Sequence, residues 1–252
     1  MTKTILITGA SSGIGAACVE QASKLNLNVI ATARSKSKLE LLEKQFKNVQ
    51  IIVADIATET GRNIIHQSLL HPRLQPIDFL LHNAAILDAP QKLSDLSVSD
   101  FRNNIVTNVE PILFLTQKLI PNFKAAKQTG RILSISSGAA KYAIAGMGNY
   151  CVSKAAALMA NQVLKAEMPF HGVIVNDYFP GVVDTNMQKT LRSSSTDIFP
   201  YSNDFKQLKD NGQLSKPIDV AESILNIFTN TDDQTFKKNE WLFKNHNVLD
   251  KS

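Results

Sequence analysis

Short apolar runs alternate with amphipathic stretches along most of the chain. The apolar runs cover residues 4–9, 28–33, 49–55, 77–85, 131–137 and 172–179, with a last short run near 240–243. Between them, apolar residues recur with helical spacing at 13–25, 36–46, 59–70, 99–127, 150–167 and 218–228. Runs this apolar are typical of strands buried on both faces. The alternation predicts a doubly wound parallel α/β sheet with helices on both faces.

Two stretches depart from this regular pattern. The longest helical stretch, 99–127, contains Pro111, which lacks a backbone N–H and predicts a helix boundary or kink. Residues 182–216 show only short helical patterns and contain proline, glycine and three consecutive serines. Long irregular segments in compact domains are often lids or substrate loops. We expect 182–216 to be such a loop within one domain spanning 1–252; the alternative is a disordered surface excursion.

Composition excludes several classes of protein. Of the 252 residues, 44% are hydrophobic, but no apolar run approaches the ~20 residues that cross a bilayer. The run at 4–9 begins too early to follow a signal peptide. Cys18 and Cys151 lie far apart without metal-ligand spacing. We therefore expect a cytoplasmic protein with no membrane partner, no disulfide framework and no metal.

The net charge of +5 is concentrated near the N-terminus. Residues 1–47 carry seven lysines and arginines against three glutamates. Nucleic-acid-binding domains usually show a longer basic stripe and a recognisable reading element. A local basic cluster fits a small phosphate-bearing ligand, and most of these side chains also fit a solvated helix face. We expect no nucleic-acid partner.

A glycine-rich turn joins the first predicted strand to the first helix. Within TGASSGIG, residues 8–15, the glycines permit a tight turn, close approach of a pyrophosphate to backbone N–H groups and close helix–strand packing. Glycines also serve ordinary turns, so the position directly after a strand carries the inference. The turn predicts a dinucleotide site.

The end of the second apolar run bears on which dinucleotide is bound. An acidic residue there would bind the adenosine ribose of NAD, whereas Arg34 follows Ala33 in this chain. A guanidinium pairs bidentately with a phosphate, so Arg34 favours NADP (NADPH) with its 2′-phosphate. The alternative is a solvated arginine.

Tyr150 and Lys154 stand four residues apart in a predicted helix, which places them on one face. A free tyrosine has a pKa of about 10, and a nearby ammonium would stabilise the phenolate and lower that pKa. The pair is either a general acid with its activating cation or a buried ring beside a solvated lysine.

Taken together, these motifs match a known family. The chain resembles the short-chain dehydrogenase/reductases, which are single Rossmann-type domains, over nearly its whole length. Ser137 precedes Tyr150 by thirteen residues, which agrees with the family pattern. The resemblance rests on the motifs TGASSGIG at 8–15, AD at 54–55, HNAA at 82–85, Asn108, Ser137, YCVSK at 150–154 and PGVVDT at 180–185.

The resemblance implies a role for each matched residue. Tyr150 would protonate the substrate's carbonyl oxygen, and Ser137 would hydrogen-bond that oxygen, so both would bind substrate. Lys154 would bind the nicotinamide ribose, and Asn108 would hold a water linking Lys154 to solvent. The implied cofactor-binding residues are Gly9, Ser11, Ser12, Gly13, Ile14, Gly15, Arg34, Asp55, Ile56, Asn83, Ala84, Tyr150, Lys154, Pro180, Gly181, Val183 and Thr185.

Two residues depart from the family's Asn-Asn-Ala-Gly motif. His82 and Ala85 replace its first Asn and its Gly. The added methyl of Ala85 would tighten the nicotinamide pocket. No carboxylate or cysteine cluster accompanies His82, so we expect a hydrogen-bonded strand-end histidine rather than a metal ligand.

Within the family, the stretches 136–156, 180–199 and 205–217 look most like benzil and sepiapterin reductases. These enzymes reduce vicinal dicarbonyl compounds with NADPH. The resemblance therefore implies an NADPH-dependent carbonyl reductase. Met147 stands where an aromatic residue is common, and residues 240–250 offer no match to the acidic residue that anchors a pterin.

Two alternative functions remain open. One is an NADP-dependent dehydrogenase of a secondary alcohol; the other is a catalytically silent dinucleotide-binding regulator. A silent regulator need not keep Ser137, Tyr150 and Lys154 together, as this chain does. The family's usual assembly implies a homodimer, with a tetramer possible, through the helices near 105–126 and 150–167.

Overall fold

A seven-stranded sheet forms the centre of the molecule. The computed structural model describes residues 2–74, 76–124, 129–238 and 240–243. The strand order is β3-β2-β1-β4-β5-β6-β7, and every neighbouring pair is parallel. This confirms the predicted Rossmann-type fold class. The strands are β1 (Thr4–Thr8), β2 (Asn28–Ala33), β3 (Val49–Val53), β4 (Phe79–His82), β5 (Gly130–Ile135), β6 (Val173–Phe179) and β7 (Trp241–Leu242).

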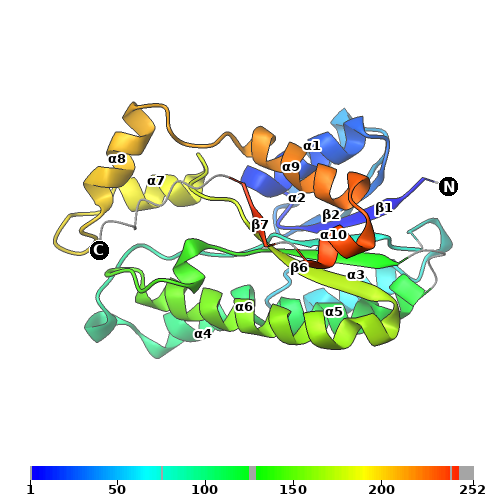
Figure 1. The fold of residues 1–252 in the computed structure, drawn as a ribbon, viewed down its shortest axis with the longest axis horizontal. Helices are drawn as coiled ribbons and strands as arrows, with labels where there is room; N and C mark the ends of the chain where they lie inside the picture. Colours follow the sequence, from blue (N-terminus) through cyan, green and yellow to red (C-terminus); the bar gives the residue numbers. More distant parts are fainter. Residues whose placement is uncertain (1, 75, 125–128, 239, 244–252) are drawn as a thin grey trace.

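Helices cover both faces of the sheet (Figure 1). One face carries α1 (Gly13–Lys24), α2 (Lys36–Gln45), α9 (Pro217–Asn230) and α10 (Asp233–Lys238). The other carries α3 (Glu59–Ser68), α4 (Val98–Asn108), α5 (Glu110–Lys124) and α6 (Gly148–Glu167). Two further helices stand together at one end of the molecule, α7 (Asn186–Arg192) and α8 (Ser202–Asp210).

The strands are apolar throughout because each face of the sheet packs on its own layer of helices. Along β1, Ile5 and Ile7 join the core cluster beneath α1 and α9. Leu6, between them, joins the cluster beneath α3, α5 and α6. All three side chains are fully buried. Side chains alternate between the two faces of a strand, so a sheet covered on both sides needs apolar residues at successive positions.

The helix predicted over 99–127 is in fact two helices. α4 ends at Asn108 and α5 begins at Glu110, which places Pro111 in the first turn of α5. The first-turn N–H groups of a helix have no intrahelical partner, so proline is tolerated there and favours a new start. Residues 125–127 of the prediction lie outside the described residues.

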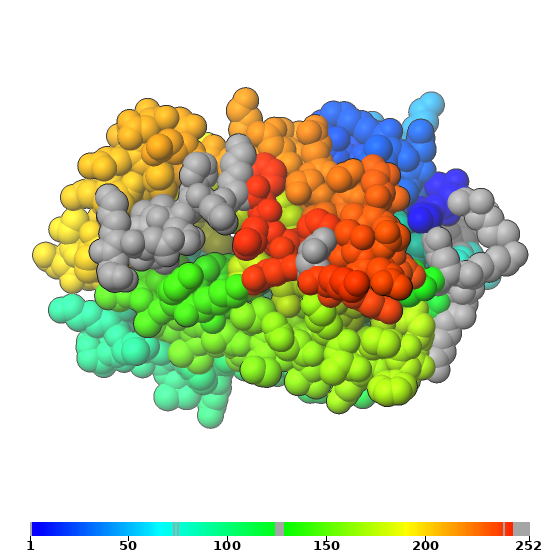
Figure 2. Space-filling model, viewed as in Figure 1, coloured from blue at the N-terminus to red at the C-terminus, as the bar shows by residue number. Residues whose placement is uncertain are grey.

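The segment 182–216 is more regular than the sequence indicates. It contains α7 and α8, and a parallel bridge joins Val183 to Ser215. Phe199 and Phe205 pack there with Tyr150 and Met147 in a third apolar cluster. The short helical patterns of the sequence correspond to these two helices, which contacts with distant residues stabilise; the role of 182–216 as a substrate loop stays a prediction. Figure 2 shows α8, in gold, as a lobe at one end of the molecule.

None of the helices within the described ranges is long and apolar enough to cross a membrane.

Candidate active site

A cavity of about 710 Å³ opens at the carboxyl ends of the strands. β1 lies between β2 and β4 there. The chain runs from β1 to β2 and β3 on one side and then crosses to β4 on the other, so the strand order reverses beside β1, as at the ligand crevice of other open parallel sheets. Every residue predicted to bind cofactor or substrate lines the cavity except Gly15, and every predicted catalytic residue does so except Asn108. The fold thus brings into one cavity predicted site residues that lie as far apart in the sequence as Gly9 and Thr185.

The glycine-rich turn forms one wall of the cavity. Gly9 and Gly13 have φ angles of 65° and 55°, a region that residues with a Cβ rarely adopt. A Cβ on Gly9 would also lie 2.7 Å from the Cα of Ala84. Gly15 does not line the cavity; it packs against the turn, where a Cβ would lie 2.3 Å from the carbonyl oxygen of Gly9. Its role is close packing of α1 on the turn.

Asn83 and Thr8 hold this turn against the end of β4. The Asn83 side-chain amide donates to the carbonyl oxygens of Thr8 (2.9 Å) and Gly9 (3.2 Å). The Thr8 hydroxyl accepts from the backbone N–H groups of Asn83 (3.0 Å) and Ala84 (3.1 Å). Asn83 therefore acts on the shape of the turn, and Thr8 supports the turn through contacts with a distant strand that its place in the glycine motif does not reveal.

Basic side chains mark the end of the cavity beside β2. Arg34 and Lys38 are exposed and line it. Asp55 lines the cavity too, and its carboxylate accepts from the backbone N–H of Ala57 at 3.0 Å, which fixes the loop that carries Asp55 and Ile56. This end therefore offers cations for an anionic group and a short loop of defined shape.

A buried arginine supports that loop from below. The Arg62 guanidinium donates to the carbonyl oxygen of Ile56 at 2.8 Å and pairs with Glu110 at 3.0 Å. A buried charge needs such partners to offset its desolvation. Sequence reasoning missed Arg62 because Glu110, its partner, lies 48 residues away.

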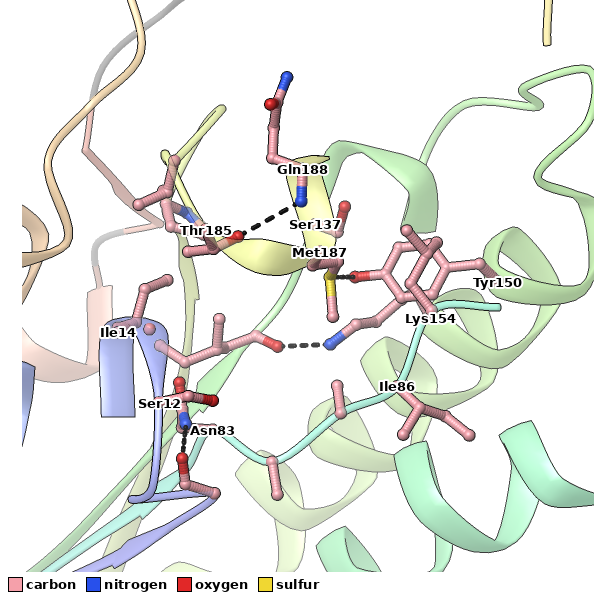
Figure 3. A pocket seen from close by; sticks show the side chains of 18 of the residues that line it. Ser12, Ile14, Asn83, Ile86, Ser137, Tyr150, Lys154, Thr185, Met187 and Gln188 are labelled. Carbon is pink, nitrogen blue, oxygen red and sulfur yellow. Dashed lines mark hydrogen bonds between the residues drawn. The ribbon is translucent and has the colours of Figure 1, made fainter. Parts of the chain in front are cut away.

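Tyr150 and Lys154 point into the cavity from adjacent turns of α6 (Figure 3). The Lys154 Nζ lies 5.8 Å from the centroid of the Tyr150 ring and donates to the carbonyl oxygen of Ile135 at 2.9 Å. The Tyr150 hydroxyl lies 3.9 Å from the Met187 sulfur. Ser137 faces the same space from the end of β5, where its Oγ accepts from the backbone N–H of Ala139.

Burial controls the protonation of this pair. It raises the pKa of Tyr150 above its ordinary value, and a hydrogen bond with Ser137 opposes the rise. It also lowers the pKa of Lys154 to about 8, against the raising effect of Asp177. Burial is the largest influence on the tyrosine pKa here and acts opposite to the direction expected from Lys154 alone; the lowering effect of Lys154 stays a prediction. The Tyr150 hydroxyl is therefore protonated at neutral pH, and the Lys154 ammonium loses its proton near pH 8.

Asn108 lies behind the cavity wall. Its amide donates to the Ile86 carbonyl oxygen (3.0 Å) and the Ser153 hydroxyl (2.9 Å), and accepts from the Ile86 N–H (2.8 Å). These contacts brace the segment after β4 against α6. A water held by Asn108 stays a prediction.

His82 is a hydrogen-bonded strand-end histidine, as expected. Its Nε2 lies 2.9 Å from the Thr116 hydroxyl, and burial lowers its pKa to about 3, so the ring is neutral. Ala85 lines the cavity. No cluster of potential metal-ligating side chains occurs among the described residues.

The end of the cavity beyond Tyr150 is lined mainly by apolar side chains, with the amide of Gln188 on α7 among them. These walls come from the segments after β4 and β6, the loop before α6, α7 and α8, and their apolar residues are Leu87, Ile144, Met147, Val182, Met187, Leu191 and Phe205. Among the described residues that line this end, Lys141 and Lys154 are the charged ones. Lys141 pairs with Glu240. Residues 244–250, part of the stretch compared above with the pterin anchor, lie outside the described residues.

The residues present fit a nicotinamide dinucleotide. A Cβ would collide with backbone at Gly9 and Gly15 and would press on the Thr185 side chain at Gly13, so the close turn requires glycine. The N-terminus of α1 follows directly, with no side-chain cap from Ser12. Free N–H groups at a helix N-terminus bind phosphates. The buried hydroxyls of Thr32 and Ser136 line the cavity without a partner among the described residues.

Three comparisons with known proteins agree with this geometry. Benzil reductase ((S)-benzoin forming) from Bacillus cereus is 30% identical over 231 residues, covering 88% of this chain and 92% of that enzyme. NADPH-dependent pterin aldehyde reductase from Arabidopsis thaliana is 28% identical over 200 residues, covering 78% and 81%. A solved short-chain dehydrogenase/reductase from Saccharomyces cerevisiae matches with a TM-score of 0.82 at 25% identity, covering 98% of both chains.

The family profile described as short chain dehydrogenase matches residues 3–196. This confirms the resemblance seen in the sequence, together with the nicotinamide dinucleotide cofactor it implies. The chain belongs to the short-chain dehydrogenase/reductase family and is an oxidoreductase that acts on C=O or CH–OH groups.

Proposed function

We propose that this protein is an NADPH-dependent carbonyl reductase acting on a ketone of a vicinal dicarbonyl compound, like the benzil and sepiapterin reductases. One observation carries the proposal. The hydroxyl groups of Tyr150 and Ser137 face the apolar end of a single cavity whose other end carries Arg34.

The cofactor would lie along the carboxyl edge of the sheet. The glycine turn and the N-terminus of α1 would hold the pyrophosphate, and Arg34 would pair with a 2′-phosphate. Asn83, Pro180 and Thr185 would flank the nicotinamide half. When bound, the dihydronicotinamide supplies a hydride. The name of the Arabidopsis relative, an NADPH-dependent enzyme, supports the choice of NADP.

The chain's own residues supply the proton and the orientation. Because burial keeps Tyr150 protonated, its hydroxyl is ready to donate to the carbonyl oxygen as negative charge develops there. Ser137 adds a second hydrogen bond to that oxygen. Lys154, as an ammonium beside the ring, stabilises the tyrosinate left after the transfer.

The lining of the substrate end favours a neutral, apolar substrate. A substrate carboxylate desolvated there would need a cation, but Lys154 serves Tyr150 and Lys141 is paired with Glu240. The aliphatic and sulfur-containing walls instead fit the flanks of a bulky diketone. The similarity to benzil reductase supports this substrate class.

The test is NADPH oxidation against a panel of benzil, an aliphatic diketone, sepiapterin, a ketosteroid and a simple aldehyde, with NADH in parallel. We expect turnover of benzil with NADPH and little with NADH. Turnover of secondary alcohols alone would favour a dehydrogenase. Tight NADPH binding with no turnover in either direction, and no effect of Tyr150→Phe, would favour a silent regulator.

We further propose that residues 1–252 form one domain in which 182–216 is the substrate loop, and that the protein is a cytoplasmic homodimer. Exposed apolar residues on α4, α5 and α6, namely Phe101, Phe114, Val152, Met159 and Val163, support a dimer contact through these helices. Cys18 and Cys151 are unpaired, which suits a reducing compartment. Sedimentation showing only monomer at micromolar concentration would contradict the dimer.

A further inference from the structure

Met187 contacts Tyr150, the proposed proton donor, from α7 across the cavity. It belongs to α7, and its side chain points toward Tyr150, with Sδ 3.9 Å from the tyrosine hydroxyl (Figure 3). Met187 is half-buried and lines the cavity, so a small solute that enters the cavity reaches its thioether. The proton that the substrate must receive therefore lies next to a methionine sulfur.

A thioether and its sulfoxide differ sharply as hydrogen-bond acceptors. The thioether sulfur is a weak acceptor, which a carbonyl oxygen displaces at little cost. Oxidation to the sulfoxide makes the side chain polar and adds an oxygen on the sulfur atom that already contacts the hydroxyl. In an apolar surrounding such as this one, a polar oxygen gains most by pairing with a donor. The Tyr150 hydroxyl is the donor at hand.

We propose that Met187 is a peroxide-sensitive modification site that switches the reductase off. The Met187 sulfur attacks the terminal oxygen of a hydroperoxide; the S–O bond forms, the O–O bond breaks, and the proton of the attacked oxygen passes to the leaving oxygen. Sulfur loses two electrons, the peroxide is reduced, and water or an alcohol leaves. The sulfoxide oxygen then takes the hydrogen bond of Tyr150 in place of the substrate's carbonyl oxygen. This inference rests on the proposed role of Tyr150 as proton donor.

The chain offers matched controls. Met159 is 65% exposed on α6 and is absent from the cavity lining, so it should oxidise readily without effect on activity. Met168 is only 2% exposed and should resist oxidation. Cys151, next to Tyr150 in sequence, is half-buried, and burial raises the pKa of its thiol. A raised pKa leaves less of the reactive thiolate.

The experiment is a hydrogen peroxide titration of the whole protein, with peptide mass mapping of each methionine and activity on the substrate found in the panel. In wild type and Met159→Leu, we expect at least a tenfold loss of activity that parallels oxidation of Met187. Methionine sulfoxide reductase should restore it. In Met187→Leu, the ratio of treated to untreated activity should stay near one. Cys151→Ala should lose activity as wild type does. Full activity with Met187 oxidised, or equal loss in Met187→Leu, would overturn the proposal.

A second readout does not depend on turnover. With 13C-labelled tyrosine, the ring Cζ resonance of Tyr150, assigned by its absence in Tyr150→Phe, should shift when Met187 is oxidised. The same treatment should leave that resonance in place in Met187→Leu. An inactive untreated enzyme that shows this shift contradicts the proposed function alone. An active enzyme without the shift contradicts the switch alone.

Discussion

The two ends of the cavity are built in different ways. The dinucleotide end is made largely of backbone: glycines at positive φ, the N-terminus of α1, and a turn held by the Asn83 amide. The substrate end is made of side chains from the loop before α6 and from α7 and α8. Backbone geometry recognises the phosphates that any dinucleotide carries. Side chains decide which carbonyl compound fits, so specificity can change at one end while the cofactor site is kept.

The largest effect should come from the point where the two ends meet. Tyr150→Phe removes the proton donor, and general acid catalysis typically contributes ~10²–10⁴-fold in rate. We expect kcat for the dicarbonyl to fall by about 10³-fold while the NADPH dissociation constant, measured by fluorescence, stays within about twofold. An equal loss of both would mean that the variant damages the cofactor end.

A change at the glycine turn should damage the dinucleotide end alone. Gly9→Ala puts a methyl group 2.7 Å from the Ala84 Cα at a positive φ, so the turn must move or the variant must unfold. We expect NADPH binding at least ~10-fold weaker and a lower melting temperature, from backbone strain of about 1–2 kcal/mol or more. Gly138→Ala is the stability control, because a Cβ there meets nothing within 4 Å. Unchanged NADPH binding in Gly9→Ala would contradict the proposal that the glycine-rich turn binds the pyrophosphate.

Replacing Arg34 should weaken the use of NADPH and leave the use of NADH nearly unchanged. A charge-assisted hydrogen bond contributes ~1.5–3 kcal/mol, so Arg34→Ala should raise KM for NADPH by ~10–100-fold and leave KM for NADH nearly unchanged. Lys36→Ala is the matched control, since Lys36 pairs with Glu40 and does not line the cavity. Equal effects on both cofactors would contradict recognition of a 2′-phosphate by Arg34.

The pH profile tests the charge beside Tyr150. Burial lowers the pKa of Lys154 to about 8, so the ammonium is present below that pH and lost as pH rises through it. The rate should therefore decline above pH 8. Asp177 raises this pKa, so Asp177→Asn should start the decline at lower pH. A pH–rate profile that stays in place in Asp177→Asn would contradict the electrostatic coupling between Asp177 and Lys154.

The lowered pKa of Lys154 also affects the stability of the fold. The folded pKa of Lys154 lies below its ordinary value of 10.5, so the unfolded chain binds more protons between pH 8 and 10.5. The contribution of Lys154 to the free energy of unfolding should therefore rise with pH across this window. Denaturant titrations of wild type and Lys154→Met should show that rise only in wild type; parallel curves would contradict it.

The smallest effect should appear at the substrate end. Leu191 is 6% exposed in the wall formed by α7, and Leu191→Ala opens space there. Losing a few methylene groups of contact changes substrate discrimination by about 10-fold, so the preference for benzil over a small aldehyde should fall by that order. NADPH affinity should stay unchanged. An unaltered ratio of kcat/KM values would mean that α7 does not shape this end.

Local sequence determined the parts of the site that depend on neighbouring residues. The glycine turn, the four-residue spacing of Tyr150 and Lys154, and the position of Arg34 after β2 follow from steric allowance, helical periodicity and strand order. The fold class follows from apolar runs that only a sheet covered on both faces can bury. All of these features lie in continuous stretches of chain.

Tertiary structure decided what depends on distant partners. Met187 reaches Tyr150 across 37 residues, and Arg62 reaches Glu110 across 48. α7 and α8 form because their apolar residues pack on Tyr150 and Met147, which a short local pattern cannot reveal. The pKa of Tyr150 also rises, where spacing alone suggests that it falls. Spacing shows only the nearby cation, whereas desolvation depends on every element that covers the ring.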